Sequence, residues 1–103
     1  IKQHAIGALT CQQRDLFKNP FLAHELKAYD AAIINPPRLG AKAQTEELGK
    51  SDISQIAMIS CNPATFSRDA KILKNYGFSL RSASGVDQFV FSPHLEVVSL
   101  FYR

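Results

Sequence analysis

The sequence is poor in several features that would assign a protein to a broad class at once. It has only two cysteines in 103 residues, Cys11 and Cys61, which do not make a disulfide framework. No Cys or His pair has zinc-ligand spacing, so we expect no metal site. Every apolar run is far shorter than the ~20 residues that a membrane helix needs. These absences favour a cytoplasmic protein in a reducing setting, without a membrane partner.

Composition and charge fit a small domain but do not identify a partner. Hydrophobic residues make up 46% of the chain and charged residues 20%, enough for one compact domain over residues 1–103. The formal charge of +3 suits a polyanion, yet such a mild basic bias does not by itself indicate nucleic-acid binding. Because the chain starts at Ile1 in what reads as the middle of an element, we expect a piece of something longer.

Apolar strand patterns alternate with helical patterns along the chain. Strands are expected over 8–13, 30–34, 55–60, 78–83 and 95–102. Helical patterns cover 21–28, 45–50 and 62–76. This alternation predicts a parallel sheet with right-handed crossovers, in which the strand over 30–34 is buried. No helical period separates the last two strands, so we expect the last to return antiparallel beside its predecessor.

Cys61 stands where an apolar strand gives way to a helix. Asn62 is a preferred N-cap residue, and Pro63 is favoured in the first helical turn. The unpaired N–H groups and the positive dipole end that follow stabilise negative charge on a nearby sulfur. Cys61 is therefore a candidate nucleophile, although a cysteine after an apolar run is more often a small packed hydrophobe.

Two further polar side chains are expected beside Cys61. In open parallel sheets the ligand site lies off the carboxyl ends of the strands, where both Asn35 and Cys61 fall. An antiparallel last strand starts at that same edge, which brings Glu96 to it. A thiol, an amide and a carboxylate would then converge. This suggests covalent chemistry in which Cys61 attacks and Glu96 handles a proton.

Three motifs resemble those of a known family, the RNA uracil carbon-5 methyltransferases that make 5-methyluridine in tRNA and ribosomal RNA. Residues 35–40 resemble its Asp-Pro-Pro-Arg-x-Gly segment, and 60–65, followed by Arg68 and Asp69, resemble its nucleophile motif. Residues 86–96 resemble its C-terminal signature ending in His-x-Glu, and residues 14–17 extend the likeness upstream. Each motif could be chance, but all three in order are highly specific.

The resemblance implies an α/β fold that is the C-terminal portion of a class I (Rossmann-like) methyltransferase, mostly parallel with an antiparallel last strand. It implies that Cys61 attacks carbon-6 of a uracil and that Glu96 removes the carbon-5 proton. The methyl donor would be S-adenosylmethionine, contacted by Asn35 and with Asp15 near its adenine ring. Asn35 replaces the usual aspartate, which removes a charge near the cationic sulfonium.

The implied substrate is a loop uridine in tRNA or ribosomal RNA, because a loop base leaves its stack at low cost. Arg38 and Arg68 are expected to contact phosphate or orient the uracil, since guanidinium is a rigid multi-donor cation. No glycine-rich turn or following acidic residue for the donor ribose is present. We therefore expect the donor-binding half and the RNA-binding regions to be missing, and the isolated chain to be inactive.

Two other functions compete with methyl transfer. A cysteine-dependent hydrolase would use Cys61 together with His94 and would need no methyl donor. A non-catalytic RNA-binding module would leave Cys61 packed and slow to react, with salt-dependent binding to a basic surface.

Overall fold

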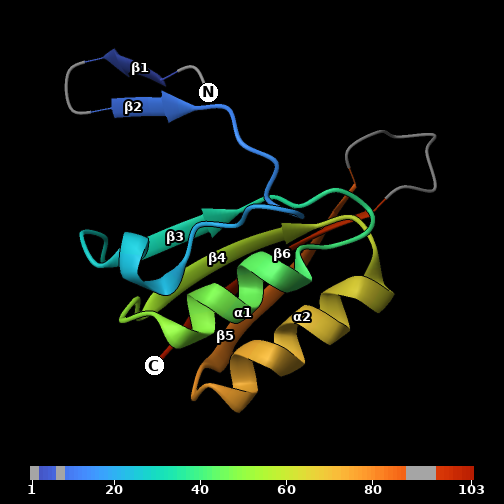
Figure 1. Ribbon diagram of the computed structural model, residues 1–103. Helices are drawn as coiled ribbons and strands as arrows, with labels where there is room; N and C mark the ends of the chain where they lie inside the picture. The colour runs from blue at the N-terminus through green and yellow to red at the C-terminus, as the bar shows by residue number, and fades with distance from the viewer. Residues whose placement is uncertain (1–2, 7–8, 88–94) are drawn as a thin grey trace.

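The computed structural model describes residues 3–6, 9–87 and 95–103, and these form two β-sheets (Figure 1). The first is a hairpin of β1 (Gln3–Ile6) and β2 (Leu9–Gln12), which stands apart from the main sheet. The strand expected over 8–13 is thus present as β2. It pairs with β1 in a sheet of its own and is not one of the strands of the main sheet.

The main sheet has four strands in the order β3-β4-β6-β5. β3 (Ala31–Ile34) and β4 (Gln55–Ser60) are parallel and are connected through α1 (Lys42–Lys50). β6 (Leu95–Tyr102) lies between β4 and β5 (Ser79–Asp87) and is antiparallel to both. The predicted α/β fold with an antiparallel last strand is confirmed. The expectation of a mostly parallel sheet is wrong for the described strands, because only β3 and β4 pair in parallel and both pairings of β6 are antiparallel.

Both α-helices cover the same face of the main sheet (Figure 1). α2 (Pro63–Asn75) begins as its sequence predicts, because the side-chain Oδ1 of Asn62 accepts a hydrogen bond of 3.0 Å from the backbone N–H of Ala64. It ends at Gly77, whose φ of +96° favours glycine. None of the helices in the described part of the chain is long and apolar enough to cross a membrane.

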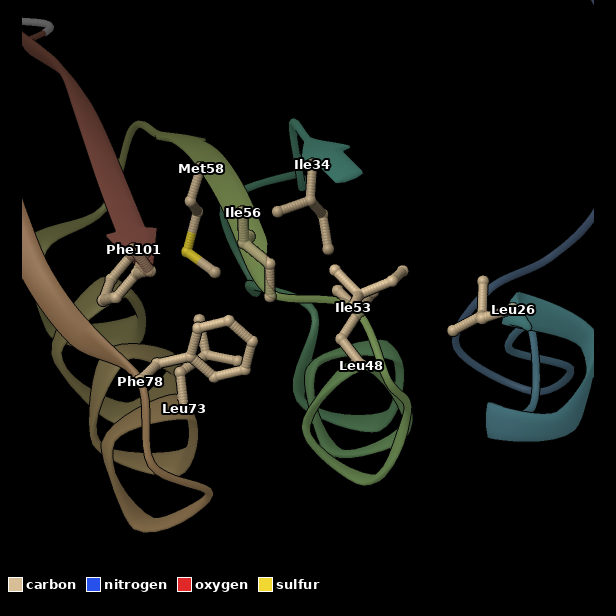
Figure 2. Packing of buried hydrophobic residues seen from close by; sticks show 9 residues of the cluster. All are labelled: Leu26, Ile34, Leu48, Ile53, Ile56, Met58, Leu73, Phe78 and Phe101. Carbon is tan, nitrogen blue, oxygen red and sulfur yellow. The ribbon is translucent and has the colours of Figure 1, made fainter. Parts of the chain in front are cut away.

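The core lies between the two helices and the face of the sheet that they cover. Residues of β4 alternate, and Ile56 and Met58 point from the strand toward Leu73 and Phe78 (Figure 2). Burial of each such apolar side chain contributes roughly 1.5–3 kcal/mol. The buried hydrophobic residues are Leu26, Ile34, Leu48, Ile53, Ile56, Met58, Leu73, Phe78 and Phe101.

The opposite face of the sheet carries no helix among the described residues. Ile33 of β3 is 80% exposed, and Leu80 of β5 is 50% exposed. The expectation of a buried strand over 30–34 is therefore wrong, because Ile34 is the only buried residue of β3. A continuous apolar run is typical of a strand covered on both faces, and only one face of this strand is covered here.

Three other element boundaries differ from the sequence prediction. The helical pattern over 21–28 is a single 3₁₀ turn, η1 (Ala23–Leu26), with no side-chain hydrogen bond from its N-cap residue. α1 starts at Lys42, three residues before the expected start. β5 continues to Asp87, beyond the predicted 83, with an irregularity in its pairing between Leu80 and Ser82.

Arg103 ties both helices to the end of the sheet that lies away from the predicted site. Its Nη1 donates to the backbone oxygens of Gly49 (2.9 Å) and Tyr76 (3.0 Å), and its Nε donates to that of Ile53 (3.0 Å). The guanidinium also lies 4.1 Å above the ring of Phe78. A cation at the carboxyl ends of two helices is favoured by both helix dipoles, so this contact fixes α1 and α2 relative to β6.

Candidate active site

Strand register brings Asn35, Cys61 and Glu96 to one edge of the main sheet. Ser60 at the end of β4 pairs with Val97 of β6, so the next position on each segment is Cys61 and Glu96. Ile34 at the end of β3 pairs with Met58, which places Asn35 alongside the residue two positions before Cys61. The register therefore places all three positions at the same edge of the sheet.

Cys61 sits at the junction between β4 and α2. Its thiol is free and half-buried, and it directly precedes the N-cap residue Asn62. The side chain of Asn62 in turn accepts from the N–H of Ala64, so Cys61 stands immediately before the first turn of α2. Cys61 is thus partly exposed, unlike the buried residues of the core.

Glu96 lies on β6, where it pairs with Val86 of β5. Its Oε2 atom is buried and has no hydrogen-bond partner among the described residues. A carboxylate oxygen without a partner keeps its lone pairs for a proton or a ligand. His94 and the other residues of 88–94, which belong to the third motif, lie outside the described residues.

The Asn-Pro-Pro-Arg-Leu-Gly segment forms a tight turn that is bound to the start of α2. Within it, the N–H of Gly40 donates to the backbone oxygen of Pro37 at 2.8 Å. The backbone oxygen of Arg38 accepts two hydrogen bonds of 3.1 Å each, from Asn62 Nδ2 and Thr65 Oγ1. The residue that caps the nucleophile's helix therefore also holds this turn.

A buried aspartate of α2 also binds this turn. Asp69 of α2 is 1% exposed, and its two carboxylate oxygens accept from the N–H of Ala41 (2.9 Å) and from Nε of Arg68 (3.0 Å). Nη2 of Arg68 in turn donates to the backbone oxygen of Leu39 at 3.1 Å. Buried charge is tolerated when it is paired in this way. The first two motifs of the sequence therefore fold as one bonded unit, which we call the turn clamp (residues 37–41 with Asn62, Thr65, Arg68 and Asp69).

We expect Gly40→Ala to destabilise the turn clamp strongly. Gly40 has a φ of +77°, and an added Cβ would lie 2.9 Å from both Asp69 Oδ2 and Thr65 Cβ. The left-handed backbone costs about 1–2 kcal/mol for a non-glycine residue, and overpacking adds about 1–3 kcal/mol. Gly77→Ala is the matched control, because Gly77 also has a positive φ but no atom within 4 Å of the added Cβ. Urea denaturation should show a larger loss for Gly40→Ala, and equal losses would contradict a close-packed clamp.

A small pocket lies beside Asn35 on the other side of the turn. It has a volume of about 180 Å³, and its lining includes Leu16, Phe17, Asn35 and Pro36. Asp15 shapes this pocket from outside its lining, since its Oδ1 accepts hydrogen bonds from the N–H groups of Phe17 (2.9 Å) and Lys18 (3.3 Å). Whole small-molecule sites usually measure about 300–1,000 Å³. The pocket is thus smaller than a whole small-molecule site, with mainly apolar walls and the amide of Asn35 in its lining.

The segment that carries Asp15 is braced by Arg14. The Arg14 guanidinium forms an ion pair of 2.9 Å with Glu25, and Nη2 also donates to the backbone oxygen of Pro20 at 2.8 Å. The hydrogen bond from Arg14 lowers the pKa of Glu25 below its ordinary value. Arg14 also lies 4.2 Å above the ring of Phe21. These contacts hold the segment that supplies the pocket wall.

The two arginines predicted to contact RNA lie in different surroundings. Arg38 is exposed at the tip of the turn, and its guanidinium makes no hydrogen bond to the described residues. Arg68 is half-exposed, and its Nε and Nη2 atoms are used within the turn clamp. The RNA contact of each arginine remains a prediction. Arg38 has its whole guanidinium available for such a contact, whereas two nitrogens of Arg68 are already bonded within the turn clamp.

Sequence reasoning missed the roles of Thr65, Asp69 and Phe17. Asp69 could have been found, because it lies three residues after Phe66 and four before Leu73 and so falls on the apolar stripe of α2. A charged residue on that stripe is buried and needs a partner. The pocket wall formed by Phe17 had no such signal, since it depends on how a loop folds over β3.

A larger hollow lies away from the predicted residues. It has a volume of about 670 Å³ between the second half of α2 and β5, and its lining includes Lys71, Lys74 and Phe78. None of Asn35, Cys61 or Glu96 borders it, so size alone does not locate the candidate site. Within the described residues, no three His, Cys, Asp or Glu side chains gather as ligands for a metal ion.

Comparison with known proteins gives consistent matches. A family model described as tRNA (Uracil-5-)-methyltransferase matches residues 10–103. An uncharacterized RNA methyltransferase of Caulobacter vibrioides is 46% identical over 95 residues, which cover 92% of this chain and 23% of that protein. The 23S rRNA (uracil(1939)-C(5))-methyltransferase RlmD of Hahella chejuensis is 38% identical over 78 residues, covering 76% of this chain and 18% of its own length.

A solved structure shares the fold. The tRNA (uracil-54, C5)-methyltransferase of Pyrococcus abyssi, in complex with S-adenosyl-L-homocysteine, superposes with a TM-score of 0.65 at 32% sequence identity. The match covers 74% of this chain and 19% of that one. It confirms the predicted Rossmann-like methyltransferase fold class. The chain spans about a quarter or less of the length of these proteins.

Proposed function

Because the chain belongs to the tRNA (uracil-5-)-methyltransferase family, we propose that it carries the catalytic groups of an enzyme that methylates carbon-5 of a uridine in RNA. The observation that supports this most directly is the register of β4 and β6, which puts Cys61 and Glu96 at neighbouring positions. A nucleophile and a base are both needed for this reaction. Cys61 offers a half-buried free thiol, and Glu96 offers a buried carboxylate oxygen without a partner among the described residues.

Cys61 supplies the nucleophile. An aromatic pyrimidine carbon reacts poorly with an electrophile until the ring is saturated, so covalent attack is required first. The Cys61 thiolate adds to carbon-6 of the uracil, and the electrons of the ring double bond make carbon-5 an enolate-like nucleophile. S-adenosylmethionine, when bound, supplies the electrophilic methyl group. Asn35 and the pocket beside it would hold part of this donor.

Glu96 completes the reaction by removing a proton. After methylation, carbon-5 carries both the new methyl group and its original hydrogen. Glu96 takes that hydrogen as a proton, and the released electron pair re-forms the ring double bond and expels the Cys61 thiolate. General-base help of this kind is typically worth about 10²–10⁴-fold in rate. The buried oxygen of Glu96 is free for this task among the described residues.

The proposed substrate is a uridine in a loop of tRNA or ribosomal RNA. The Hahella relative acts on ribosomal RNA and the Pyrococcus protein on tRNA, and both names specify carbon-5 of uracil. A base must leave its stack to reach Cys61, which costs a few kcal/mol and less in a loop. Arg38, which is exposed on the turn clamp, would contact the RNA backbone near that base.

We further propose that the chain is the C-terminal part of the catalytic domain. The pocket of about 180 Å³ is too small for a complete donor site of about 300 Å³ or more. The uncovered face of the sheet, marked by Ile33 at 80% exposure, is where a doubly covered fold would continue. The isolated 103 residues should bind the donor weakly and not turn over.

The proposal is tested by trapping the adduct in the full-length protein. That protein is incubated with S-adenosylmethionine and RNA in which 5-fluorouridine replaces uridine. Fluorine cannot be removed as a proton, so the methylated adduct should persist and appear by mass spectrometry on the peptide that contains Cys61. No adduct, or an adduct on the peptide that contains Cys11, would end the proposed mechanism.

A further inference from the structure

A large apolar side chain is exposed on the turn clamp. Leu39 lies at the tip of the turn, is 73% exposed and takes no part in the core. Single exposed leucines are common on protein surfaces and need no explanation by themselves. Leu39 differs because the turn that carries it is bonded to Asn62, the residue next to Cys61.

The turn clamp holds Leu39 in a fixed position. Its own backbone oxygen accepts from Arg68 at 3.1 Å, and the neighbouring oxygen of Arg38 accepts from Asn62 and Thr65. On the other side, the N–H of Ala41 is held by the buried carboxylate of Asp69. The side chain is thus presented outward by a rigid backbone, with little freedom left to fold back onto the protein.

We propose that Leu39 is an RNA-contacting wedge, which packs against the bases that flank the target uridine when that uridine leaves its stack. This inference rests on the proposed function. Extruding a base opens a gap between its neighbours, and proteins that disturb base stacks insert apolar side chains such as leucine between the steps. Exposed Arg38, next to Leu39 on the same turn, would contact a phosphate and fix the strand as Leu39 enters.

The test compares two RNAs that differ only in how well the target uridine is stacked. One is a folded hairpin with the uridine stacked in its loop, and the other is a short unstructured oligonucleotide with the same flanking sequence. A wedge matters only where a stack must be opened. In the full-length protein, Leu39→Ser should slow adduct formation on the hairpin by roughly 10-fold, while the unstructured RNA reacts within about 2-fold of wild type.

Two controls separate a wedge from general damage. Leu39→Met keeps a long apolar side chain and should restore the rate on the hairpin. Leu9→Ser removes a leucine that is 59% exposed on β2 of the separate hairpin, away from the turn, and should change neither rate. Because Leu39 is largely exposed, its replacement should not unfold the protein.

The outcomes distinguish this inference from the proposed function. If wild type forms no adduct on either RNA, the proposed function fails and the wedge fails with it. A second outcome is that wild type reacts normally and Leu39→Ser slows adduct formation equally on both RNAs, or on neither. The wedge is then wrong, and the proposed methyltransferase function is unaffected. A selective loss on the hairpin that Leu39→Met restores supports the wedge.

Discussion

Replacing Cys61 with alanine should lower the rate of methyl transfer in the full-length protein by more than about 10³-fold. The reason is that carbon-5 of uracil does not become nucleophilic unless a thiolate first adds to carbon-6. No other described side chain can supply that thiolate, since Cys11 lies on β2 of the separate hairpin. Release of labelled methyl groups into RNA measures the effect.

Cys11→Ala is the matched control for this prediction. Both changes remove one free thiol, but Cys11 is exposed on the hairpin and Cys61 is half-buried at the start of α2. Cys11→Ala should leave the rate unchanged, and donor binding should survive both changes. A Cys61→Ala variant that retained more than a tenth of wild-type activity would rule out covalent attack by this residue.

The same variants distinguish methyl transfer from the two competing functions. A cysteine hydrolase would lose activity with Cys61→Ala but would need no S-adenosylmethionine. A non-catalytic RNA-binding module would be unaffected, because its binding would depend on basic side chains and on salt. Only a methyltransferase requires both the donor and Cys61.

The fold was predictable wherever a local pattern decided it. β4 and β6 start and end at the predicted residues, because apolar runs bounded by helix-start or turn signals define them. α2 follows its Asn62 cap and its Gly77 stop in the same way. The burial of β3 was not predictable, since whether Ile33 is covered depends on chain segments that its own sequence does not describe. The pairing of β2 with β1 was not predicted for the same reason.

The candidate site was predictable to the level of the strand edge. That Asn35, Cys61 and Glu96 share a rim follows from strand direction alone, and the register places all three positions at the same edge of the sheet. The turn clamp was not predicted, because its hydrogen bonds run from α2 side chains to the backbone of a loop more than twenty residues away. Backbone N–H and C=O groups are the same in almost every residue type, so such contacts become visible only once the fold is known.

Glu96→Gln should leave attack by Cys61 intact and stall the enzyme one step later. Glutamine has nearly the shape of glutamate but cannot accept the carbon-5 proton, so release of the product should slow by about 10²–10⁴-fold. Ordinary uridine RNA, without fluorine, should then accumulate as a methylated adduct on Cys61. Labelled donor should give a burst of one methyl group per enzyme molecule, followed by very slow turnover.

Glu96→Asp separates the loss of a base from a change in packing. Aspartate keeps the carboxylate on a shorter side chain, so it should turn over slowly and show little trapped adduct. Glutamine instead places an amide where Oε2 is buried without a partner among the described residues, and an unpaired buried donor costs about 1–3 kcal/mol. Such a cost lowers stability but does not by itself trap an adduct. A Glu96→Gln enzyme that turned over slowly without a burst would therefore assign proton removal to another group, and a burst followed by arrest would assign it to Glu96.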